Sequence, residues 1–150
     1  MLSALSRVAL AAMMTAALAA CSTGGLSPGL SQRMDMPGAQ LNRADALNIV
    51  NQYRSSTGAG PLTDDSSLDA TAQTLVTQYA KTGHQPAAPA GTLDIRYSAG
   101  YFTFAETFSG WRNSTTDAPA IADAKATRAG LAAIFDNNTP YGVYWVIILG

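Results

Sequence analysis

Cysteine is nearly absent from this sequence, because Cys21 is the only one in 150 residues, and no disulfide can form within the chain. Charged side chains are also scarce, at 13% of the residues. Eight Lys and Arg remain once Arg7 is set aside, against ten Asp and Glu, and they form no basic cluster. The sequence therefore lacks the clustered positive charge that nucleic-acid binding requires. The apolar fraction of 47% favours a folded domain over a disordered chain.

The first 20 residues have the organisation of an export signal. Arg7 precedes an apolar run from Val8 to Ala20, which ends in small residues that a signal peptidase accommodates. A membrane-spanning helix needs about 20 predominantly apolar residues, and this run is shorter. We therefore predict that residues 1–20 are a signal peptide, removed on export.

The residues around the predicted cleavage site, Leu18-Ala19-Ala20-Cys21, resemble the lipobox of bacterial lipoproteins. The resemblance implies that the Cys21 thiol is diacylated, that the chain is cut before Cys21 and that the new amine is acylated, which anchors the protein stably in a membrane. The alternative is an ordinary secreted protein with a cysteine near the cut. By analogy with Gram-negative lipoproteins, Ser22 in place of aspartate favours the outer membrane over the inner one. We expect an envelope protein that faces the periplasm.

Beyond the anchor, the sequence divides into two parts. Residues 21–40 are rich in Gly, Ser, Pro and Met without a sustained period, which predicts a flexible tether. Residues 41–150 are enough for one compact domain and too few for two ordinary ones.

Two helices are predicted in the first half of the domain. The first begins near Asn42, whose side chain can cap it, and ends before Gly58. The second has Ser66 and Asp69 in the spacing of a capping box, and Gly83 is its expected C-terminal cap.

A third helix is predicted from Phe104 to Asn113. Thr103 and Glu106 have capping-box spacing, so the simplest role of Glu106 is to close that box rather than to catalyse. Phe104, Phe108 and Trp111 fall on one face of this helix, which therefore needs a sheet to cover.

The remaining segments predict that sheet. Residues 92–97 contain a weak strand signal, and residues 115–126 are polar, with at most a turn or short helix. Residues 128–136 form a strand-like stretch. Residues 143–149 are apolar without alternation, which is typical of a strand buried on both faces.

Three groups of residues occur in an order that is characteristic of one family. They are Leu47 to Arg54 followed by Gly58 and Pro61-Leu62, then Trp111-Arg112-Asn113-Ser114, and last the Tyr144-Trp145 strand. This order resembles the bacterial branch of the CAP superfamily, also called the SCP domain, over residues 41–150. The resemblance implies an α/β fold, a three-layer α-β-α sandwich of the CAP/SCP type.

Many members of that family have a cleft lined by two histidines and two acidic residues, and in some it binds a divalent cation. His84 matches the first histidine, whereas Ile95 stands at the position of a glutamate and Asp117 at that of the second histidine. A chain with one histidine and one glutamate, Glu106, cannot supply the full set, and zinc sites need three or four such ligands. We therefore predict no metal and no cofactor.

The leading hypothesis is a non-enzymatic envelope lipoprotein whose degenerate cleft is used for binding or scaffolding. The candidate cleft residues are His84, Glu106, Ser114 and Asp117. A hydrolase is the first alternative, with His84 as general base, Asp117 orienting it and Ser114 as nucleophile. In the simpler interpretation, His84 is a partly exposed residue at a helix end, and Ser114 and Asp117 cap helices or turns.

The second alternative is a carrier of lipid or another apolar ligand. Tyr101, Phe102, Phe104 and Phe108 are close in the sequence and could line a groove. Aromatic residues at helical spacing in a small domain more commonly belong to the core. The partners expected from the sequence are thus a membrane, through Cys21, and either an envelope component or an apolar ligand, with no nucleic acid.

Overall fold

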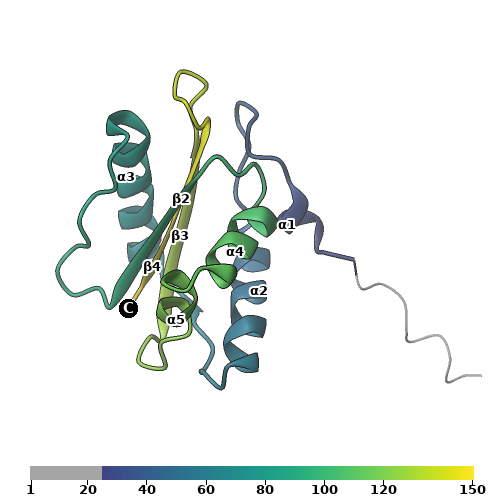
Figure 1. The fold of residues 1–150 in the computed structure, drawn as a ribbon, viewed down its shortest axis with the longest axis vertical. Helices are drawn as coiled ribbons and strands as arrows, with labels where there is room; N and C mark the ends of the chain where they lie inside the picture. Colours follow the sequence, from purple (N-terminus) through teal and green to yellow (C-terminus); the bar gives the residue numbers. More distant parts are fainter. Residues whose placement is uncertain (1–24) are drawn as a thin grey trace, which may run out of the picture.

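The structure, a computed structural model, describes residues 25–150 as one four-stranded sheet with helices on both faces (Figure 1). The strands lie in the order β1 (Thr63–Asp64), β3 (Arg128–Phe135), β4 (Val143–Leu149) and β2 (Asp94–Ala99). β4 pairs antiparallel with β3 and with β2, and β1 pairs parallel with β3. All seven residues of β4 are buried, as the unbroken apolar run predicts.

Helix α3 (Ser66–Thr82) covers one face of the sheet, and the other helices cover the opposite face (Figure 1). Those helices are α1 (Pro28–Ser31), α2 (Arg43–Ser56), α4 (Phe104–Asn113) and α5 (Asp117–Ile121). Side chains of β4 alternate between the two layers: Trp145 and Ile147 pack with α2 and α4, whereas Tyr144 and Val146 pack with α3. The three-layer α-β-α sandwich is therefore confirmed.

Helix ends follow the local signals, with one correction. Asn42 caps α2 by accepting the Asp45 amide, and Gly83 ends α3 at a φ of 71°. The predicted capping box of Ser66 and Asp69 is wrong, because Asp65 is the N-cap of α3 and accepts the amides of Ser67 and Leu68. Asp69 accepts the Leu131 amide of β3 instead, at 2.8 Å. β1 is too short to pair with that part of β3, so a side chain supplies the missing acceptor.

The segment before α2 corrects the prediction of a flexible tether. Leu30 and Met34 are buried, and the Met34 amide donates to the Phe102 carbonyl at 2.8 Å. Asp45 accepts hydrogen bonds from Ser27 Oγ and from the Gly29 amide. The folded unit therefore includes residues from Ser27 onward, well before residue 41. The missed signal is the pair of apolar residues four positions apart, set among Gly, Ser and Pro.

The predicted signal peptide, residues 1–20, and Cys21 lie outside the described residues. Within residues 25–150, no helix has the length and apolar character needed to span a membrane.

Candidate functional site

Helix α4 is fixed in place at its start and along its inner face. The Thr103 hydroxyl accepts the Glu106 amide, and Glu106 Oε2 in return accepts the amides of Thr103 and Phe102 at 3.0 and 3.1 Å, which confirms the predicted capping box. Phe104, Phe108 and Trp111 are buried against the sheet. The Trp111 indole also donates to the Tyr97 carbonyl of β2 at 3.1 Å. The outer face of α4 is therefore held at a defined height above β2.

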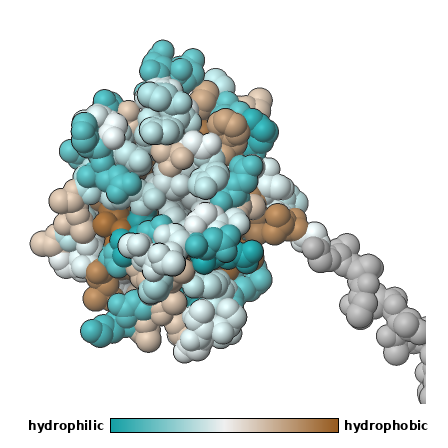
Figure 2. Space-filling model, in the orientation of Figure 1, coloured by the Kyte–Doolittle hydropathy of each residue, from teal (hydrophilic) through white to brown (hydrophobic). Residues whose placement is uncertain are grey.

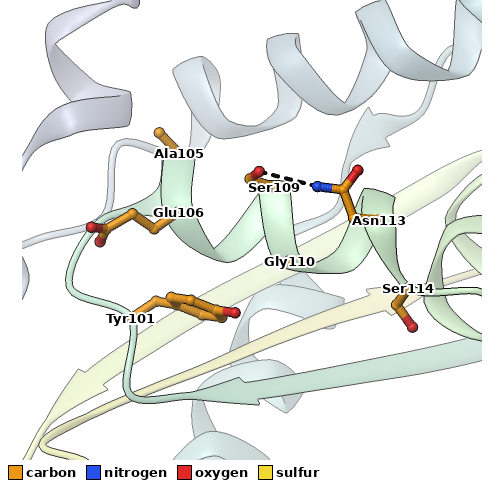
Figure 3. Close-up of a pocket in the computed structure, with 7 residues that line it drawn as sticks. All are labelled: Tyr101, Ala105, Glu106, Ser109, Gly110, Asn113 and Ser114. Atoms are coloured by element: carbon orange, nitrogen blue, oxygen red, sulfur yellow. Dashed lines mark hydrogen bonds between the residues drawn. The ribbon is translucent and has the colours of Figure 1, made fainter.

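A groove of about 640 Å³ runs along that outer face (Figure 3). Its lining residues are Tyr101, Ala105, Glu106, Ser109, Gly110, Asn113 and Ser114. The Tyr101 ring, 41% exposed, lies against Gly110, where a β-carbon would come within 3.0 Å of the ring. In Figure 3 the side chains of Ser109 and Asn113 point toward each other, and their polar atoms are 3.5 Å apart.

Most of the side chains that line this groove are uncharged. It offers an aromatic face, two serine hydroxyls and one amide, and its single carboxylate, Glu106, is already bound to the start of α4. Such groups donate and accept hydrogen bonds without a net charge preference. The groove therefore fits a neutral ligand with hydroxyl or amide groups and a flat apolar face that can stack on Tyr101.

Two of the predicted cleft residues, Ser114 and Asp117, are hydrogen-bonded to each other. The Ser114 hydroxyl accepts the amides of Asp117 and Thr116, at 3.1 and 3.3 Å. The Asp117 carboxylate lies 3.4 Å from Nε of Arg96, whose Nη2 donates to Asp94 at 2.8 Å. Arg96 and Asp117 are about a quarter exposed. An arginine between two carboxylates thus occupies the neighbourhood of Asp117, the residue predicted to stand in place of a second histidine.

His84 lies apart from these groups. Its side chain is exposed, and Nδ1 is 2.8 Å from the Thr82 carbonyl within the same turn. Among residues 25–150, no hydrogen bond joins His84 to Ser114 or Asp117. The serine, histidine and aspartate that a hydrolase would need are therefore not in contact in series. Ile95 packs in the core on the α3 side of the sheet and offers no ligand.

The aromatic residues proposed for a lipid carrier do not line one groove. Phe104 and Phe108 are 1% and 4% exposed and belong to the core, whereas Tyr101 and Phe102 lie on the surface. The small hollow between α4 and α2, about 240 Å³, is lined by Leu30 and Phe108 but by none of the other three aromatic residues.

The sequence matches the family described as cysteine-rich secretory proteins, abbreviated CAP, over residues 47–149. The chain belongs to the CAP family. A search of curated proteins gave no match.

Solved structures show the same CAP fold at low sequence identity. An outer surface protein of Borrelia burgdorferi superimposes with a TM-score of 0.59 and 14% identity, over 75% of this chain and 97% of that one. An extracellular SCP-domain protein of Bacillus anthracis superimposes with a TM-score of 0.58 and 15% identity, over 85% of this chain and 45% of that one. A cysteine-rich secretory protein of Staphylococcus aureus superimposes with a TM-score of 0.53 and 15% identity, over 71% of this chain and 37% of that one. These relatives are bacterial surface or extracellular proteins.

The residues of this CAP domain do not fit a divalent cation. Within the part of the chain that the structure describes, no three side chains of His, Cys, Asp or Glu lie close enough to share a metal. Asp117 and Asp94 both face Arg96, whose guanidinium offsets the charge of one carboxylate. His84 has no carboxylate hydrogen-bonded to it. The arrangement leaves no set of three ligands for zinc.

The melting temperature is therefore expected to change by less than about 1 °C when zinc or a chelator is added. A metal at 100 times its dissociation constant would stabilise the fold by about 2.7 kcal/mol and raise the melting temperature by several degrees. Differential scanning calorimetry with zinc and with EDTA measures this, and His84→Ala is the control variant. A rise above about 3 °C that His84→Ala removes would show that a metal site exists.

Two of the four predicted cleft residues, Glu106 and Ser114, line this groove, but the groove itself was not predicted from the sequence, although part of its signal was present. Glu106, Gly110 and Asn113 are spaced by four and three residues, which places them on one face of the helix, opposite Phe104, Phe108 and Trp111. What the pattern could not show is that Tyr101, from the preceding loop, folds back against Gly110.

Proposed function

We propose that this protein is a lipoprotein of the bacterial cell envelope whose CAP domain binds an envelope component without catalysing a reaction. Its acylated Cys21 anchors it to a membrane, the outer one, facing the periplasm. The lipobox-like residues support the anchor, and the bacterial surface and extracellular relatives support the location.

One observation carries the binding role. The ionisable groups at the expected cleft are paired with one another or exposed. The groove beside α4 is open, and an exposed tyrosine ring and uncharged polar side chains line most of it. Its aromatic face and its hydroxyl and amide groups suit a ligand with sugar hydroxyls and peptide amides. The glycan and peptide units of the cell wall carry both. We therefore propose soluble cell-wall fragments as the probe ligand.

Titration of the ¹⁵N-labelled domain with these fragments is expected to shift the amide signals of Ser109, Gly110 and Asn113. Tyr101→Ala should weaken binding about tenfold, which corresponds to about 1.4 kcal/mol of lost stacking. Tyr141→Ala is the matched control, because Tyr141 is also an exposed tyrosine, at 54%, and does not line the groove. Equal binding by the two variants, or shifts confined to other elements, would contradict a binding role for the groove.

The anchor is tested separately. Intact mass spectrometry of the protein extracted from membranes should show acyl chains on Cys21, and Cys21→Ser should move the protein to the soluble fraction. A membrane-bound Cys21→Ser variant without acyl mass would argue against the lipid anchor.

A further inference from the structure

The segment that follows the anchor is rigidly attached to the domain. We call residues 25–36 the N-terminal arm. Leu30 and Met34 of the arm are buried, and Met34 forms a backbone hydrogen bond to Phe102. The Gly29 amide donates to Asp45 at the start of α2, at 3.1 Å. The arm therefore moves with the sandwich rather than as a free linker.

Exposed apolar side chains gather on and beside this arm. Leu26 and Met36, both on the arm, are 58% and 60% exposed, and Phe102, in the loop under it, is 38% exposed. The guanidinium of Arg33 lies 4.9 Å from the centre of the Phe102 ring. Exposed Arg112 and Leu26 line the same small hollow on α4. We call Leu26, Arg33, Met36, Phe102 and Arg112 the arm surface.

The chain length between the anchor and the arm limits where this surface can lie. Leu26 is five residues after Cys21, and five fully extended residues span at most about 18 Å. If Cys21 carries acyl chains in a bilayer, Leu26 cannot be farther than that from the lipid-embedded residue. Figure 2 shows hydrophobic residues, in brown, where the grey chain meets the domain. Leu26, at the start of the arm, thus lies on the side of the domain from which the chain runs to Cys21.

We propose that the arm surface rests on the membrane that holds the acyl chains of Cys21. Leu26, Met36 and Phe102 contact the boundary between headgroups and acyl chains, and Arg112 contacts lipid phosphates. Arg33 pairs with Asp35 on the same arm, so its charge is already balanced there. Apolar side chains beside arginines suit this boundary, because the arginine stem is apolar and its head is charged. The inference rests on the proposed lipid anchor. It fixes the orientation of the domain, with α3 turned away from the lipid and the groove beside α4 next to it.

Site-directed spin labelling tests this orientation with the full mature lipoprotein. Because the Cys21 thiol is acylated, Met36→Cys introduces the one thiol that accepts a nitroxide label. Gln78→Cys, exposed on α3 across the sheet, is the matched control. In vesicles of phosphatidylethanolamine and phosphatidylglycerol, the ratio of oxygen to nickel-chelate accessibility should be several-fold higher at residue 36 than at residue 78.

The outcomes separate the two proposals. Acylated protein whose labels at residues 36 and 78 are equally accessible to the nickel chelate would overturn the membrane contact and leave the anchor intact. Absence of acyl mass on Cys21 would overturn both. Dipolar broadening between labels at residue 36, lost on dilution in lipid, would show that a second copy covers the arm surface in place of the membrane.

Discussion

Replacing Arg54 by methionine is expected to lower the free energy of unfolding by about 3–5 kcal/mol. The side chain is fully buried at the end of α2. Its guanidinium donates to the carbonyls of Gly60, Ile121, Asp123 and Ala126, at 2.8, 2.6, 3.0 and 2.9 Å. Methionine fills a similar volume but has no donor, so the carbonyls of Gly60, Ile121 and Ala126 would lose this partner, whereas that of Asp123 keeps the Ala126 amide. Buried acceptors without partners carry their full desolvation cost.

The size of this effect follows from what the arginine connects. Gly60 belongs to the loop after α2, whereas the other acceptors belong to α5 and the turn before β3. One side chain thus supplies hydrogen bonds to two connecting segments that have no sheet of their own to pair with. A small domain has a total stability of only about 5–15 kcal/mol, so the variant is expected to be largely unfolded at mild urea concentrations.

Equilibrium urea unfolding, followed by the fluorescence of the buried Trp111 and Trp145, measures the difference. Arg112→Met is the matched control, because Arg112 is an exposed arginine in the last turn of α4, and the change there should stay within about 0.5 kcal/mol. A loss below about 1 kcal/mol for Arg54→Met would mean that water can replace the guanidinium in these contacts.

Features that depend on neighbours in the sequence could be predicted. The capping box of Thr103 and Glu106 spans three residues, and Gly83 ends a helix through its own φ angle. The run from Val143 to Leu149 predicts burial on both faces because no polar residue interrupts it. The order of such segments along the chain also indicates the CAP fold, because each segment can be recognised from its own residues.

Features that depend on residues far apart in the sequence could not be predicted. The residues next to Arg54 do not show that it is buried, because basic residues commonly occupy the last turn of a helix. Its burial arises only when α5 and the turn before β3 fold over it. Asp69 likewise looks like a capping residue, and it becomes an acceptor for β3 because β1 is short. The groove could not be predicted for the same reason, since its aromatic side chain, Tyr101, comes from a loop outside α4.

Gly130→Ala is expected to destabilise the domain about as much as Arg54→Met, with a loss of about 3 kcal/mol or more in the free energy of unfolding. Gly130 lies on β3 directly under the first turn of α3. A β-carbon at this position would lie 2.2 Å from the carbonyl carbon of Leu68 and 2.5 Å from the amide nitrogen of Asp69. Both are backbone atoms, so no rotamer change can relieve the contact. The helix itself would have to move.

That movement would break contacts on both sides of the substitution. Displacing the first turn of α3 strains the hydrogen bond from Leu131 to Asp69 and the ion pair of Arg128 with Asp65. The melting temperature of Gly130→Ala should therefore be lower than that of the unchanged protein by roughly 10 °C or more. Gly60→Ala is the matched control, since a β-carbon at Gly60 meets nothing within 4 Å and should alter stability by less than about 0.5 kcal/mol. If Gly130→Ala and Gly60→Ala have the same melting temperature, α3 packs more loosely on β3 than these distances require.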